Sequence, residues 1–196
     1  MARLATELAR DRSPEYLFNH AARTFLFGAL IGNARNLKFD SEILYLACIL
    51  HDLGLTDRFA GPLPFEIQGA QAARGFLTEN GLPNDQANMV WDGIAMHPSA
   101  IVFFKQPEIA LVSAGAGADV VGSDLEKIPE SAKAAVAHAF PRLDFKHAFV
   151  KTCAGVVRRF PRGASRSFMR DIGERNVEEF HPTHICDLID QAPFTE

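Results

Sequence analysis

Hydrophobic positions along the chain recur mainly at intervals of three and four residues, and no segment alternates polar and apolar residues over a sustained run. Three- to four-residue intervals are typical of an α-helix with one buried face, whereas alternation is typical of a half-buried strand. Pro and Gly separate the periodic segments, as they do where helices begin and end. We therefore predict a single all-α domain without a sheet, built from seven to nine helices.

Capping residues indicate where these helices begin and end. Ser13 is a suitable N-cap for a helix with Pro14 at its first position, and this helix runs towards Asn33. Asp40 or Ser41 caps the next helix, which ends near residue 52. The remaining predicted helices cover approximately residues 65–80, 84–97, 107–122, 130–140 and 144–160, with one or two short helices in the tail.

Composition excludes several classes of protein. The 196 residues are 47% hydrophobic and 22% charged, which suits one soluble domain with a sizeable core, and the net charge of −4 argues against a nucleic-acid partner. No apolar run approaches the roughly 20 residues of a membrane span, and the charged N-terminal stretch lacks the apolar region of a signal peptide. The three cysteines, Cys48, Cys153 and Cys186, are far apart, which fits a reducing cytosol. We expect a cytoplasmic protein with no membrane partner.

Two histidines lie on helix faces that the sequence predicts to be buried. His20 shares its face with Leu17 and Thr24 by helical spacing, and that face is small or apolar. His51 shares its face with Ala47 at the end of a long apolar run. Both imidazoles should therefore point into the core.

Two carboxylates have unusual surroundings. Asp52 is rotated about 100° from His51 on a helix, so both can reach one ion only beside the helix end, where Gly54 permits close approach. Asp119 lies in a segment rich in Gly and Ala, and residues 106–126 contain no Lys or Arg. Because isolated buried charge is very costly, Asp119 needs a cation from elsewhere or must face solvent.

His20, His51, Asp52 and Asp119 together form a candidate metal site. Two imidazoles and two carboxylates suit Zn(II), Fe(II) or Mn(II) and leave room for a water molecule. A His-Asp doublet is a weak signal alone, and the alternative is four polar residues that are satisfied separately.

The order of these residues is more specific than the doublet. A lone His, an apolar run into His-Asp-x-Gly and then a lone Asp resemble the HD-domain superfamily of metal-dependent hydrolases, which bind one or two divalent ions in a helical bundle. The resemblance implies metal ligation by His20, His51, Asp52 and Asp119. It predicts one HD domain over residues 1–196, with a metal-binding core at about residues 14–122 and C-terminal helices over residues 123–196.

Four stretches, "FNHAARTFLFG", "LHDLGLTD", "FEIQGA" and "AMHPS", resemble the cyanamide hydratase-like branch of that superfamily. Its better-known members add water to the nitrile of cyanamide and give urea. The resemblance implies that Asn19 and Arg23 flank the first ligand and that Thr56 and Glu66 line the pocket. Arg23 is expected to pair with Asp52 or to orient the substrate.

A metal-activated water also needs a group that moves its proton, and Asp52, His97 and Glu66 are the candidates. His97 ends a predicted helix just before Pro98, where an imidazole is either a proton carrier or a partner of the helix dipole. Glu66 begins a helix, where a carboxylate also complements the dipole. The other histidines, His138, His147, His181 and His184, are expected at the surface, in packing or in caps.

We therefore expect an enzyme that uses a metal-activated water on a small-molecule substrate, as a hydratase or hydrolase. A phosphohydrolase acting on a nucleotide or another phosphoester is an alternative, although Leu55 stands where many HD phosphohydrolases carry a Lys. A non-catalytic HD module that binds a ligand is a third possibility. The number of ions, the metal and the oligomeric state, including a homo-oligomer, stay open.

Overall fold

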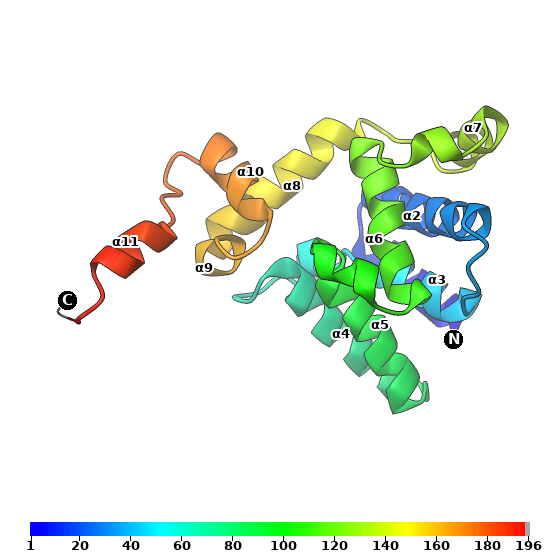
Figure 1. Ribbon diagram of the computed structural model, residues 1–196, viewed down its shortest axis with the longest axis horizontal. Coiled ribbons are helices and arrows are strands. Elements are labelled where there is room, and N and C mark those ends of the chain that lie inside the picture. The colour runs from blue at the N-terminus through cyan, green and yellow to red at the C-terminus, as the bar shows by residue number, and fades with distance from the viewer. Residues whose placement is uncertain (195–196) are drawn as a thin grey trace.

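The computed structural model describes residues 1–194, and no strand occurs in that range, which confirms the predicted all-α fold (Figure 1). Eleven α-helices are present in these residues, more than the seven to nine predicted, because α1 and the short α9 were not expected. The α-helices are α1 (Ala2–Arg12), α2 (Glu15–Ala34), α3 (Ser41–Leu50), α4 (Phe65–Glu79), α5 (Asn84–Met96), α6 (Pro107–Val121), α7 (Glu130–Ala139), α8 (Phe145–Arg159), α9 (Pro161–Ala164), α10 (Met169–Asn176) and α11 (Ile185–Asp190). Three 3-10 helices, η1 (Leu53–Leu55), η2 (Ala100–Phe104) and η3 (Leu125–Lys127), lie between them.

Helices α2 and α6 pack against each other through glycine. A Cβ atom on Gly115 of α6 would lie 2.0 Å from the main-chain oxygen of Thr24 in α2, and one on Gly28 would lie 2.7 Å from that of Leu111. Such close approach of two backbones is open to glycine alone. The contact brings the middle of α2, with His20, against the C-terminal half of α6.

A glycine also allows close backbone contact between the turn after α3 and helix α4. Asp40 is the N-cap of α3, as expected, because its side chain accepts hydrogen bonds from two main-chain N–H groups of the first turn. Beyond the other end of α3, a Cβ atom on Gly54 of η1 would lie only 1.9 Å from the main-chain oxygen of Phe65. The residues that follow α3 are therefore fixed against the first turn of α4.

The buried apolar side chains form two clusters. The larger, here called the bundle cluster, lies mainly among α1 to α6. The smaller, here called the C-terminal cluster, joins α8 and α10 to Leu17, Leu55 and Phe65 of the bundle. Helix α11 extends away from both (Figure 1), and its apolar residues Ile185 and Leu188 are exposed.

Several peripheral expectations can be compared with the fold. No helix within residues 1–194 is long and apolar enough to cross a bilayer. All three cysteines are free thiols, with Cys48 and Cys153 buried and Cys186 exposed. The side chains of four histidines are exposed, in agreement with a surface or capping role: His138, His147, His181 and His184.

Candidate metal centre

Three of the four predicted ligands meet at the junction of α2 and α3. His20 comes from α2, and His51 and Asp52 directly follow α3. Nε2 of His20 lies 3.5 Å and Nε2 of His51 lies 3.3 Å from Oδ2 of Asp52, and the three side chains are buried. Zinc–ligand distances of roughly 2.0–2.1 Å in a tetrahedron separate ligand atoms by about 3.3–3.4 Å. The spacing of these atoms therefore fits a single transition-metal ion.

Hydrogen bonds fix the tautomer of each imidazole near this junction. Nδ1 of His51 and Nδ1 of His97 each lie 2.7 Å from the main-chain oxygen three residues earlier, and Nδ1 of His20 lies 2.6 Å from Oδ2 of Asp119. Because these oxygens accept hydrogen bonds, each Nδ1 carries the proton and each Nε2 keeps its lone pair free. Metal-binding histidines usually have this arrangement, with the second nitrogen donating to a carbonyl or carboxylate.

The charge balance around Asp52 also points to a cation. Its Oδ2 is buried and has no hydrogen-bond partner within residues 1–194. Burial raises the pKa of Asp52, and burial together with the neighbouring His20 lowers the pKa of His51 to about 3. A divalent ion bound at this buried carboxylate would compensate its charge. The residues present therefore fit a divalent metal ion.

The structure places Asp119 behind His20 and outside the group of three. Its carboxylate accepts hydrogen bonds from Nε of Arg23 at 2.7 Å, from Nη2 of Arg23 at 2.8 Å and from Nη1 of Arg142 at 2.8 Å. Although burial by itself raises the pKa of Asp119, hydrogen bonds from His20 and Arg23 bring it well below its usual range. The cation that α6 lacks is thus supplied by α2, and Asp119 holds the ring of His20.

A cavity of about 360 Å³ opens onto these residues. Its polar lining consists of His20, His51, Asp52, His97 and Ser113, and the rest is apolar or glycine. The C-terminal part lines it with two rings, Phe149 and Phe168, and the ring of Phe149 lies 5.9 Å from that of His20. The apolar lining comprises Phe65, Pro98, Ala116, Val120, Val121, Phe149 and Phe168, together with Gly117. Sequence analysis missed Phe149 and Phe168. The amphipathic pattern of α8 predicts a buried face for Phe149 but not its partner, and Phe168 lies outside the helices, just before α10.

Comparison with known proteins agrees with this geometry. Residues 17–107 match the family model described as HD domain. Residues 17–107 are thus similar to an HD domain. The matched segment includes His20, His51, Asp52 and His97 and ends before Asp119.

Two relatives extend the comparison beyond the HD domain. The cyanamide hydratases DDI2 and DDI3 of Saccharomyces cerevisiae are each 27% identical to this chain over 182 residues, which cover 90% of this chain and 81% of each relative. The predicted resemblance is confirmed, and so is the predicted class of metal-dependent hydrolases and hydratases.

Three residues expected near substrate lie elsewhere in the HD domain. Arg23 is 1% exposed and contacts Asp119 and two main-chain oxygens after α7, so the expected pairing with Asp52 does not form. Asn19 donates a hydrogen bond to the main-chain oxygen of Pro141. Thr56 donates to a main-chain oxygen of η1 and lines a separate concavity of about 830 Å³. These polar groups bind the backbone and do not line the cavity at the candidate ligands.

His97 and Glu66 lie near the cavity of the HD domain in different ways. His97 follows α5 and lines the cavity, with its ring 5.0 Å from that of His51. Glu66 lies in the first turn of α4, as predicted, but lines a neighbouring cleft and not the cavity itself. His97 is thus the candidate proton carrier with direct access to the site.

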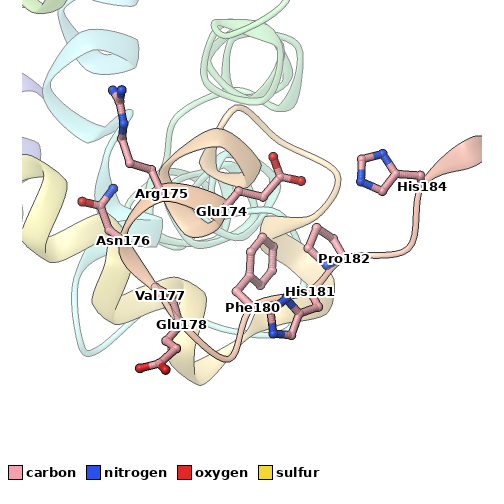
Figure 2. Close-up of a pocket in the computed structure, with 9 residues that line it drawn as sticks. All are labelled: Glu174, Arg175, Asn176, Val177, Glu178, Phe180, His181, Pro182 and His184. Carbon is pink, nitrogen blue, oxygen red and sulfur yellow. The ribbon is translucent and has the colours of Figure 1, made fainter.

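A second pair of histidines lies in the C-terminal segment, where a concavity of about 610 Å³ follows α10 (Figure 2). Figure 2 shows the imidazoles of His181 and His184 apart from each other, on either side of Pro182. His184 lies 3.1 Å from Nη2 of Arg170. Within residues 1–194, the three side chains at the HD motif are the one group of His, Cys, Asp or Glu whose ligand atoms converge.

Proposed function

We propose that this chain is a cyanamide hydratase-like enzyme that adds water to a small nitrile at a divalent-metal site held by His20, His51 and Asp52. The observation that carries the proposal is the convergence of two free Nε2 atoms on the unpartnered Oδ2 of Asp52, at the inner end of a mostly apolar cavity. The named activity of DDI2 and DDI3 supports the nitrile as the reacting group. Zn, Fe and Mn all suit this donor set.

The proposed reaction is a hydration. A bound divalent ion lowers the pKa of a coordinated water to about 7 and polarises the group under attack. The oxygen of water forms a bond to the nitrile carbon, one π bond of the C≡N group breaks, and the nitrogen takes up a proton. Transfer of the second proton from oxygen to nitrogen gives the amide, which is urea when the substrate is cyanamide.

The proton transfers are assigned to His97. Its Nδ1 is committed to a main-chain oxygen, so Nε2 is the atom that can accept and return a proton. Burial, together with the nearby His51, lowers the pKa of His97 to about 4, so its neutral form, which accepts protons, is available at neutral pH. Asp52 stays a ligand, and Asp119 orients His20 with the help of Arg23 and Arg142.

The lining of the cavity favours a neutral substrate over a phosphoester. None of the described residues that line it is Lys or Arg, and Arg23, the nearest buried cation, is occupied by Asp119. Phosphohydrolase sites commonly place Arg or Lys on the phosphate oxygens. The phosphohydrolase alternative is therefore the weaker proposal.

An assay panel tests this function. Metal-loaded protein is incubated with cyanamide, small nitriles, phosphodiesters and nucleoside monophosphates, and the products are quantified for wild type, His51→Ala and the control His184→Ala. We expect hydration of cyanamide or a nitrile by wild type and His184→Ala and none by His51→Ala. If the protein hydrolyses only the phosphoesters, the phosphohydrolase assignment replaces the hydratase assignment. If metal-loaded protein turns over none of the compounds, the result favours the ligand-binding module.

A further inference from the structure

A second cleft, of about 330 Å³, adjoins the metal cavity. Pro98 and Phe168 line both spaces, and the ring of Phe65 lies 5.7 Å from that of His97 and 5.5 Å from that of Phe168. The two spaces are thus neighbours that share Pro98 and Phe168 in their lining. The cleft is lined by Glu66, Ala95, Pro98, Ser99, Ser165, Arg166, Ser167 and Phe168.

Glu66 is the unusual residue in this cleft. It is 8% exposed, and its Oε2 is buried without a hydrogen-bond partner within residues 1–194. Burial raises the pKa of Glu66, and hydrogen bonds from its own N–H and from the Ser167 hydroxyl only partly offset this. An unpartnered buried acceptor costs free energy, and native proteins rarely keep one without a reason. The helix dipole of α4 does not explain why Glu66 is buried, because an exposed Glu in the first turn would interact with the dipole equally well.

The other polar groups of the cleft complement this acceptor. Arg166 is exposed and forms no ion pair among the described residues, so its guanidinium is free to donate. The hydroxyl group of Ser99 accepts a long hydrogen bond of 3.4 Å from a main-chain N–H group, which leaves its O–H free to donate. One side of the cleft therefore accepts an N–H and the other donates to an oxygen, which matches the two edges of a carboxamide.

We propose that this cleft is a second subsite that binds a carboxamide or ureido group of the substrate, with N–H on Glu66 and the carbonyl oxygen on Ser99 or Arg166. The substrate is then a small molecule with a reactive group in the metal cavity and an amide-type group past Phe168. The identity of the reacting nitrile rests on the proposed function, whereas recognition of the amide does not.

A matched pair of nitriles tests the subsite by turnover. 2-Cyanoacetamide and methyl cyanoacetate have similar size and the same nitrile, but only the amide offers an N–H donor. Wild type should prefer the amide by roughly tenfold or more in kcat/KM, as expected for one hydrogen bond to a charged group. Glu66→Leu should lose this preference through KM, whereas Glu79→Leu, an exposed site at the other end of α4, should keep it.

Calorimetric titration with malonamide supplies a readout that does not depend on turnover. Malonamide should bind wild type and Glu79→Leu and bind Glu66→Leu at least tenfold more weakly, with unchanged metal content in all three. Malonamide binding that depends on Glu66, without hydration of any nitrile, would refute the hydratase and leave the subsite standing. Equal preference and equal binding in Glu66→Leu and wild type would overturn the subsite and leave Glu66 hydrated by water.

Folding of the variants is addressed separately. Glu66→Leu replaces an unpartnered buried carboxylate by an apolar group of similar size, so it should fold at least as well as wild type. Ser165→Lys, at a half-buried position on the edge of the cleft, gives a second route because its ammonium can pair with Glu66 and block the cleft. It should weaken malonamide binding as Glu66→Leu does, and full-strength binding by this variant would also contradict the subsite.

Discussion

The bundle of α2 to α6 and the C-terminal helices α8 to α10 line the same cavity with different kinds of residue. The bundle contributes the polar ring: His20, His51, Asp52 and His97. The C-terminal part contributes aromatic rings, with Phe149 on α8 and Phe168 just before α10. All the polar groups of the lining therefore come from the bundle, which also supplies apolar residues such as Phe65 and Val120, whereas the C-terminal part supplies apolar rings alone.

Two helical glycines, one in each region, have different surroundings. In the bundle, glycines let helices meet backbone to backbone, as Gly115 does against Thr24. In α8, a Cβ atom on Gly155 would meet nothing within 4 Å. Placing several ligand atoms within a few tenths of an ångström needs a backbone that cannot shift, whereas an apolar wall tolerates small movements. Substitution should thus be far more costly at Gly115 than at Gly155.

The largest expected loss of stability comes from Arg23→Met in the bundle. The change leaves the buried carboxylate of Asp119 with Arg142 and His20 alone, and breaking a buried ion pair costs about 3–5 kcal/mol. Urea unfolding of the metal-free protein measures the free energy of unfolding directly. A loss below about 1 kcal/mol would mean that Asp119 does not depend on α2 for its charge balance.

The pH dependence of the same pair sharpens the test. The pKa of Asp119 is lowered in the folded state, so the ion pair contributes stability that is present above about pH 4 and is lost as the pH falls through the folded pKa. The deficit of Arg23→Met should therefore be largest near neutral pH and shrink below about pH 4, since protonation of Asp119 removes the unpaired charge. A deficit that is independent of pH would point to lost packing instead.

Gly115→Ala and Gly155→Ala compare the same change in the two regions. A methyl group at Gly115 would overlap the main chain of α2, so we expect a loss of about 3 kcal/mol in unfolding free energy. At Gly155, in the middle of α8, the same change should stabilise by roughly 0.5–1 kcal/mol because alanine favours the helix. Equal effects at the two positions would remove the distinction drawn between them.

The smallest effect is expected in α11. Leu188 is 55% exposed and lies on a helix without buried residues, so Leu188→Ser should change the unfolding free energy by less than about 0.5 kcal/mol. Thermal unfolding at low protein concentration checks this. A loss above 1 kcal/mol would show that α11 packs on the domain in solution.

The ligand group was accessible to sequence analysis because its determinants are local. Helical spacing placed His20 and His51 on buried faces, and the HD doublet lies at a helix end that Gly54 marks. Contacts between distant segments were not accessible. Arg23 and Asp119 are 96 residues apart, and the sequence around either residue does not indicate which residue it contacts. Phe149 could be assigned to a buried face of α8, but where that face docks depends on tertiary packing.

The short C-terminal helices show a further limit. Helix α9 has four residues and α11 has six, too few for hydrophobic periodicity to distinguish a helix from a turn. The surroundings of Glu66 were also not predictable from the sequence. Its position at a helix start was predictable, while its burial in a cleft beside the metal cavity follows from the docking of residues 165–168.

The metal content of purified protein tests the central claim most directly. Wild type and His184→Ala, loaded with Zn, Fe or Mn and freed of excess metal, should each retain about one equivalent by elemental analysis, because three protein ligands converge on the ion. His51→Ala should retain less than about a tenth of that, because it loses one of the three converging ligand atoms. Full metal occupancy in His51→Ala, or none in wild type with any of the three metals, would contradict the assignment of His20, His51 and Asp52 as the metal centre.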